Sequence, residues 1–188
     1  MTTTTTETAL AATTGTWAID PSHSRLGFAT KHAMVATVRG QFNAFSGSLV
    51  LDGSSPTASG ATVEIDAASF ASGNEDRDKH VRGADFLDVE QYPTLQFVAR
   101  SVRRTDDDAF VMVGDLTIRG TTRPVEIKAE LEGIVTDPWG NERIGFAGTT
   151  QISRKDFGLT WNVALEAGGV LVSDTVKISL DVSATRQG

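Results

Sequence analysis

Several residue types and patterns are missing from this sequence of 188 residues or are scarce in it. It contains no cysteine, which excludes disulfide bonds, thiolate catalysis and cysteine-based zinc or iron–sulfur sites. Basic residues are outnumbered, 17 against 24 acidic ones, and the net charge of −7 repels phosphate groups, so nucleic acid is not expected as a partner. No apolar run approaches the roughly 20 residues of a membrane-spanning helix.

The first residues of the sequence do not have the pattern expected of a signal peptide. Residues 1–14 are rich in Thr and Ala, contain no Lys or Arg, and have no apolar run longer than the stretch from Ala9 to Ala12. Their composition predicts a disordered tail in front of a single domain over residues 15–188. We therefore expect a cytoplasmic protein.

The common catalytic and cofactor motifs do not occur either: the sequence has no nucleophile elbow, Walker loop, dinucleotide-binding glycine motif or zinc-protease motif. The nearest approach to a metal site is Asn74, Asp76, Asp78 and Asp85, which occupy positions 1, 3, 5 and 12 of an EF-hand loop, but Lys79 stands where the loop needs glycine. An acidic helix start is the better interpretation. We expect that the protein binds no metal or cofactor and is not an enzyme.

What the sequence does contain is alternation. In residues 125–132 every apolar residue is followed by a charged one, which is typical of a strand with one buried and one solvated face. Turn-rich segments separate the runs, so about eight to ten antiparallel strands are expected, and a sheet of that size closes into a barrel or splits into a sandwich. The other runs with this period are residues 24–32, 61–65, 95–99, 112–118, 144–152, 157–161 and 176–182.

One segment breaks the pattern. Between Asn74 and Phe86, Asn74 is suited to cap a short helix whose first turn is acidic and whose last turn is basic, and Gly83 is suited to end it. The sequence therefore predicts an all-β protein interrupted by one or two helical turns.

The three histidines are the candidate catalytic groups. His23 lies in a turn after Asp20, and His80 lies on the predicted helix two residues after Asp78. As an alternative to a binding protein, either histidine is a candidate general base beside its neighbouring carboxylate, in an enzyme acting on a lipid or isoprenoid. Structural hydrogen bonding is the stronger interpretation for both, and the spacing gives no sign that the histidines, His32 included, converge on a metal.

A set of short motifs, in order along the chain, resembles the YceI-like family of lipid-binding proteins. The resemblance runs from about Thr16 to Val182. The matching stretches are residues 16–28 (TWAIDPSHSRLGF), 31–32 (KH), 40–42 (GQF), 45–47 (FSG), 74–82 (NEDRDKHVR), 85–86 (DF), 92–94 (YPT) with Phe97, 114–125 (GDLTIRGTTRPV) and 154–158 (RKDFG).

This resemblance implies a lipocalin-like antiparallel barrel of about eight strands, often dimeric, with the short helix packed near its mouth. It implies a hydrophobic pore that holds a polyisoprenoid, such as a quinone tail or polyprenyl chain, or another long-chain amphiphile. The protein would then sequester or carry this ligand, and no covalent step is required. The sequence departs from the family's usual residues at Thr30, Val81 and Gly83, which leaves the pore shape near the helix and the ligand's identity open.

Strand parity and side-chain size predict which residues line the pore. A barrel with a filled interior that serves as an interaction module remains an alternative, because alternation does not distinguish a cavity from a tight core. Polar residues that would reach a ligand head group, if they are not structural, are His23, Arg77, His80, Arg119 and Arg154. The predicted lining is Phe28, Phe42, Val63, Ile65, Phe97, Leu116, Ile127, Phe146, Ile152, Trp161 and Ile178.

Overall fold

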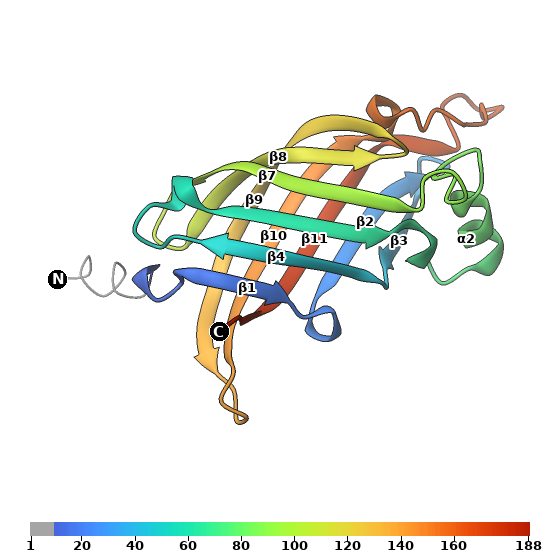
Figure 1. Ribbon diagram of the computed structural model, residues 1–188. Coiled ribbons are helices and arrows are strands. Elements are labelled where there is room, and N and C mark those ends of the chain that lie inside the picture. Colours follow the sequence, from blue (N-terminus) through green and yellow to red (C-terminus); the bar gives the residue numbers. More distant parts are fainter. Residues whose placement is uncertain (1–9) are drawn as a thin grey trace.

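The computed structural model describes residues 10–188, which form an antiparallel barrel with one short helix at one end (Figure 1). The helix is α2 (Glu75–Arg82), and single 3-10 turns are η1 (Pro21–His23), η2 (Pro56–Ala58), η3 (Ala67–Ser69) and η4 (Arg154–Phe157). The strands are β1 (Gly15–Ile19), β2 (Arg25–His32), β3 (Ala36–Phe42), β4 (Phe45–Leu51), β5 (Gly60–Asp66), β6 (Phe70–Ala71), β7 (Thr94–Arg104), β8 (Ala109–Ile118), β9 (Thr121–Thr136), β10 (Glu142–Ser153) and β11 (Val172–Arg186).

Eight of these strands close the barrel, in the order β1-β4-β5-β7-β8-β9-β10-β11, and β11 returns to β1. The closing pairs are Trp17 with Arg186, Ala18 with Thr185 and Ile19 with Ala184. All neighbouring strands are antiparallel, and closure removes the free edges on which an open sheet would aggregate. The predicted all-β barrel of about eight strands is confirmed.

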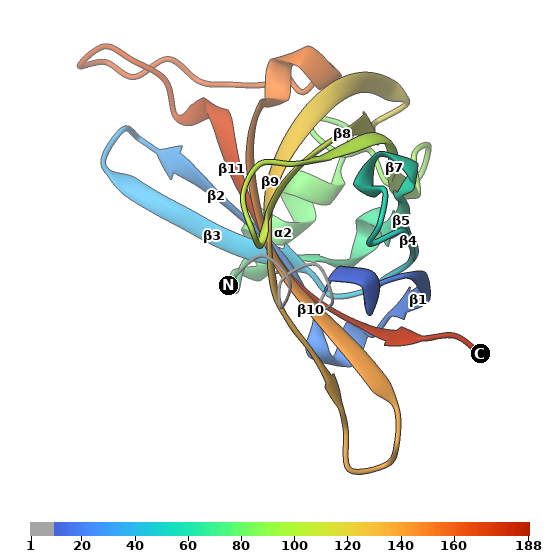
Figure 2. The ribbon, with the colours of Figure 1, turned by 90° about the vertical axis from the view of Figure 1, so that its left-hand side faces the viewer.

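β1 and β2 lie one after the other along β11, so the two ends of the barrel have different edges. β2 continues β1 after η1 and pairs with β11, while β3 precedes β4 and pairs with β2. β6 adds to β3 only through Gln41 and Phe42. The β2–β3 hairpin extends from the end of the barrel where α2 lies (Figure 1). The β9–β10 hairpin extends from the barrel in a different direction (Figure 2).

The helix forms where the sequence predicts it. The Asn74 side chain accepts a hydrogen bond from the backbone N–H of Arg77 at 2.9 Å, and the first turn carries Glu75 and Asp76. Gly83 follows as the C-cap. No helix among residues 10–188 is long and apolar enough to cross a membrane.

Two parts of the sequence prediction are corrected. Residues 157–161 do not form a strand: Phe157 ends the turn η4, and Gly158 takes a φ of +78°, which breaks an extended run. Residues 10–14, assigned to a disordered tail, pack on the barrel, with Leu10 and Thr13 each 5% exposed. The other residues of the predicted tail lie outside the described part of the chain.

Candidate ligand-binding cavity

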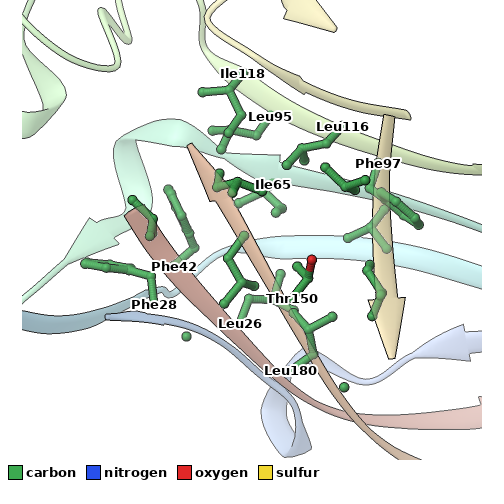
Figure 3. A pocket seen from close by; sticks show the side chains of 18 of the residues that line it. Leu26, Phe28, Phe42, Ile65, Leu95, Phe97, Leu116, Ile118, Thr150 and Leu180 are labelled. Carbon is green, nitrogen blue, oxygen red and sulfur yellow. The ribbon is translucent and has the colours of Figure 1, made fainter. Parts of the chain in front are cut away.

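The barrel encloses an elongated cavity of about 690 Å³, a size typical of small-molecule sites. Its lining extends along β11 from Val172 to Val182. These residues are ten positions apart, which corresponds to about 33 Å along a strand. Most of the lining side chains are aliphatic or aromatic, and Figure 3 shows them converging from facing strands. The cavity therefore suits a long, apolar molecule.

Along the long strands, side chains of one parity face the cavity. On β9, Val125, Ile127, Ala129 and Leu131 face the cavity, whereas the charged residues between them are exposed. All the residues predicted from parity and size lie along the cavity in the structure: Phe28, Phe42, Val63, Ile65, Phe97, Leu116, Ile127, Phe146, Ile152, Trp161 and Ile178.

The interior is hollow rather than filled. Phe28, Val63 and Ile178 line the cavity, yet each is only partly buried because its side chain borders open space. A well-packed protein core leaves few voids larger than a water molecule. The structure thus contradicts the alternative of a barrel with a filled interior.

Aromatic rings outside the long strands also shape the cavity. Phe70, in β6, stacks on Phe28 with ring centroids 4.9 Å apart and meets the edge of Phe42 at 5.8 Å. Phe86, which follows α2, lies 5.3 Å from Trp161. Sequence reasoning missed Phe70 and Phe86 because period-two parity applies only to regular strands. Their one sequence signal is that both are aromatic residues flanking the predicted helix.

A glycine leaves room for one of the lining rings. A Cβ at Gly114 would lie 2.4 Å from Cζ of Phe97, so only glycine allows this ring to lie against the backbone of β8. The Phe97 ring therefore lies close to Gly114 in the barrel wall and takes up less of the cavity.

Ionisable and aromatic groups gather at the α2 end. His80 Nε2 lies 2.8 Å from Asp85 Oδ2, and its ring meets the edges of Trp161 at 4.6 Å and Phe86 at 5.1 Å. The predicted pairing of His80 with Asp78 is wrong, because Asp78 turns the other way and accepts hydrogen bonds from the backbone N–H and hydroxyl of Ser72. His80 and Asp78 therefore do not form the base–carboxylate pair that the enzyme alternative requires.

The helix is fastened to the chain before it by a polar network. Arg77 donates from Nε to the Ser72 hydroxyl at 2.6 Å and from Nη2 to the Ser72 carbonyl at 2.9 Å. Asp78, which is 7% exposed, accepts from the same serine. Arg77 and Asp78 thus hold α2 at this end of the barrel. In the EF-hand-like pattern, Asn74 caps the helix, Asp78 bonds Ser72 and Asp85 pairs with His80.

Arg154 is a buried cation that organises the neighbouring loop. It is 4% exposed, and its guanidinium donates to the carbonyls of Ser173, Leu159, Trp161 and Val172 at 2.6–3.2 Å. Burial lowers its pKa from the usual value, and the charge of nearby Asp174 opposes this shift. These bonds hold the loop beside β11, which places Trp161 on the cavity.

His23 belongs to a surface network away from the cavity. Its Nδ1 lies 2.8 Å from Asp20 Oδ2, and the side chain is 64% exposed. Asp20 also accepts from Arg143 at 2.7 Å, and this guanidinium, with the Ser22 hydroxyl, lowers the pKa of Asp20 well below its usual range. The second base–carboxylate pair of the enzyme alternative therefore exists but does not face the cavity.

Three of the five candidate head-group residues, Arg77, His80 and Arg154, border the cavity in the structure. His23 and Arg119 are not part of the lining, and Arg119 lies 4.0 Å from Asp88. Within residues 10–188 no three His, Asp or Glu side chains are grouped so that they would hold a metal ion.

Comparison with known proteins identifies relatives over most of the chain. The YceI-like domain family matches residues 17–184. A UPF0312 protein from Pseudomonas putida is 37% identical over 165 residues, which is 88% of this chain and 82% of the relative.

Solved structures share the barrel. BcnA from Burkholderia cenocepacia has a TM-score of 0.77 and 25% identity, over 89% of this chain and 99% of that chain. A polyisoprenoid binding domain from Saccharophagus degradans has a TM-score of 0.69 over 91% of this chain and 98% of that chain. Its 13% identity makes it a likeness of fold.

Proposed function

The chain belongs to the YceI-like family, and from this premise we propose that its barrel binds a long-chain apolar ligand and sequesters or carries it. The observation that supports the proposal most directly is the elongated apolar cavity of about 690 Å³. Moving a chain of methylene groups from water into such an interior gains about 0.8 kcal/mol per group. Binding needs no covalent step, and the proposed role is not catalytic.

We propose a polyisoprenoid, of quinone or polyprenyl type, as the ligand class, with other long-chain amphiphiles as the alternative. The domain from Saccharophagus degradans, which shares the fold, is described as polyisoprenoid binding. That description supports the choice without fixing the ligand of this chain.

Ligand efficiency sets the scale of the affinity. At about 0.3 kcal/mol per non-hydrogen atom, a tail of roughly 20 carbon atoms contributes about 6 kcal/mol, which corresponds to a dissociation constant of about 40 μM. A tail that outgrows the cavity should gain little more.

Extraction of the purified protein with organic solvent, followed by mass spectrometry, tests the proposal. We expect a long-chain compound to be recovered and the ligand-free protein to take up an added prenyl quinone. Ala129→Trp, which places a bulky ring in the cavity, should abolish uptake, whereas Lys128→Trp, on the exposed face of the same strand, should not. Recovering no such compound and seeing no uptake would contradict the proposal.

Location and assembly are further proposals. We propose a cytoplasmic carrier, to be tested by cell fractionation, in which recovery outside the cytoplasmic fraction would contradict it. We also propose a homodimer, as the family resemblance implies, and sedimentation analysis that finds only a monomer at micromolar concentration would contradict that.

A further inference from the structure

At the end of the cavity away from α2, the lining includes residues from the start of the described chain. There the chain segment of residues 10–14, which we call the stopper segment, lies against the barrel (Figure 1). Leu10 and Thr13 line the cavity, and each is only 5% exposed. The segment precedes residue 17, where the match to the family begins. The family match therefore does not include this segment.

Hydrogen bonds hold the stopper segment at several points. The Thr13 hydroxyl donates to the Leu10 carbonyl at 2.7 Å, and the Trp17 indole donates to the Thr13 carbonyl at 2.8 Å. At the other end of the chain, Arg186 donates to the carbonyls of Ala12 and Thr14, and its guanidinium lies 4.3 Å from the Trp17 ring centroid. These contacts fix the backbone, so the Leu10 side chain has a defined place.

A glycine in the β4–β5 loop makes room for the segment. A Cβ at Gly53 would lie 1.7 Å from the Leu10 carbonyl oxygen and 2.8 Å from the Thr13 hydroxyl. No side chain fits at that position while the segment is in place. The Gly53 backbone N–H also donates to the Thr14 hydroxyl at 3.0 Å, so the loop and the segment are matched to each other.

We propose that the stopper segment closes this end of the cavity and that Leu10 sets the length of the ligand chain that the barrel accepts. The inference rests on the proposed function, since it assigns a length limit to the same cavity. A chain that enters tail first from the α2 end would meet Leu10 and Thr13 at the far end. Each added isoprene unit should then increase affinity until the tail reaches Leu10, and further units should add nothing or weaken binding.

The test uses the full chain and a series of all-trans prenols from farnesol through geranylgeraniol to solanesol, with affinity measured for each length. Leu10→Ala shortens the stopper side chain, and Gly53→Ala displaces the segment by a clash with its backbone. We expect both variants to move the length of strongest binding to a longer prenol than in the unaltered protein. Because the two substitutions act differently, one remains informative if the other does not fold.

Two control variants accompany them. Ala11→Ser alters an exposed residue of the stopper segment, and Gly145→Ala makes the glycine substitution where a Cβ would meet only the Glu132 side chain, at 3.6 Å. Neither should move the preferred length. Hydrogen exchange of residues 10–17 should be slow in the unaltered protein and fast in Gly53→Ala.

The outcomes separate the two proposals. If prenols bind with the same length preference in all folded variants, or if residues 10–17 exchange freely in the unaltered protein, the stopper is wrong while the proposed function stands. If no prenol binds to any variant, the proposed ligand class fails and the length limit fails with it.

Discussion

The two ends of the barrel are stabilised by different kinds of contact. At the end where β1 pairs with β11, the residues of a second core cluster pack together, and Trp17 and Ala184 in it have no exposed surface. The cluster consists of Trp17, Ile19, Leu49, Ala61, Ile144 and Ala184. At the α2 end the wall is completed by a helix and loops fastened through hydrogen bonds. One end is thus closed by apolar packing together with the hydrogen-bonded stopper segment, whereas the wall at the α2 end depends on side-chain hydrogen bonds from Arg77 and Arg154.

Replacing Trp17 should produce the largest effect. Trp17→Ala removes a fully buried side chain and its hydrogen bond to Thr13, so we expect a loss of about 3–5 kcal/mol in the free energy of unfolding, measured by urea denaturation. Trp139, at the tip of the β9–β10 hairpin and 82% exposed, provides the matched control, and Trp139→Ala should change stability by less than about 0.5 kcal/mol. Equal losses in the two variants would contradict a packed closing end.

Arg154 tests the α2 end. Arg154→Met leaves four backbone carbonyls without their donor, and we expect a loss of about 2–4 kcal/mol together with weaker binding of a prenyl quinone, because Trp161 loses its support. Lys155 forms a half-exposed ion pair with Asp174 at 2.8 Å, so Lys155→Met should cost less than about 1 kcal/mol. A small loss for Arg154→Met with unchanged binding would show that the loop is held by apolar contacts instead.

The smallest effect concerns acid stability near the closing end. Burial raises the pKa of Asp137, but hydrogen bonds from Asn141 and Arg143 outweigh this and bring it to about 2. Since the unfolded value is about 3.9, the folded state gains stability from this carboxylate above about pH 4 and loses it as the pH falls towards 2. The melting temperature of Asp137→Asn should therefore lie below that of the unaltered protein at pH 6 and approach it near pH 2. A constant difference across this range would contradict the prediction.

Much of the cavity could be predicted because side chains alternate along strands. Val125, Ile127, Ala129 and Leu131 could be assigned to one face from the sequence alone. Parity fails at bulges, since Arg100 is an extra residue between the pairs of Ala99 and Ser101, so the inward face moves from odd-numbered to even-numbered residues on β7. A bulge depends on how two strands meet, and one strand's sequence does not reveal it.

Side-chain partners set by how the chain folds back on itself could not be predicted. His80 pairs with Asp85 rather than with Asp78, because the chain turns back after α2 and Asp78 is used by Ser72. The packing of Leu10 depends on Gly53, more than 40 positions away.

By itself the sequence determined the strand pattern, the capped helix and the apolar identity of the inward face, because these follow from local propensity and from a period of two. The tertiary structure decided which strands close the ring, that the interior is hollow, and that the two ends differ. These features depend on long-range contacts: Trp17 meets Arg186 only after the barrel has closed, and Leu10 reaches the cavity only because Gly53 leaves room for its backbone.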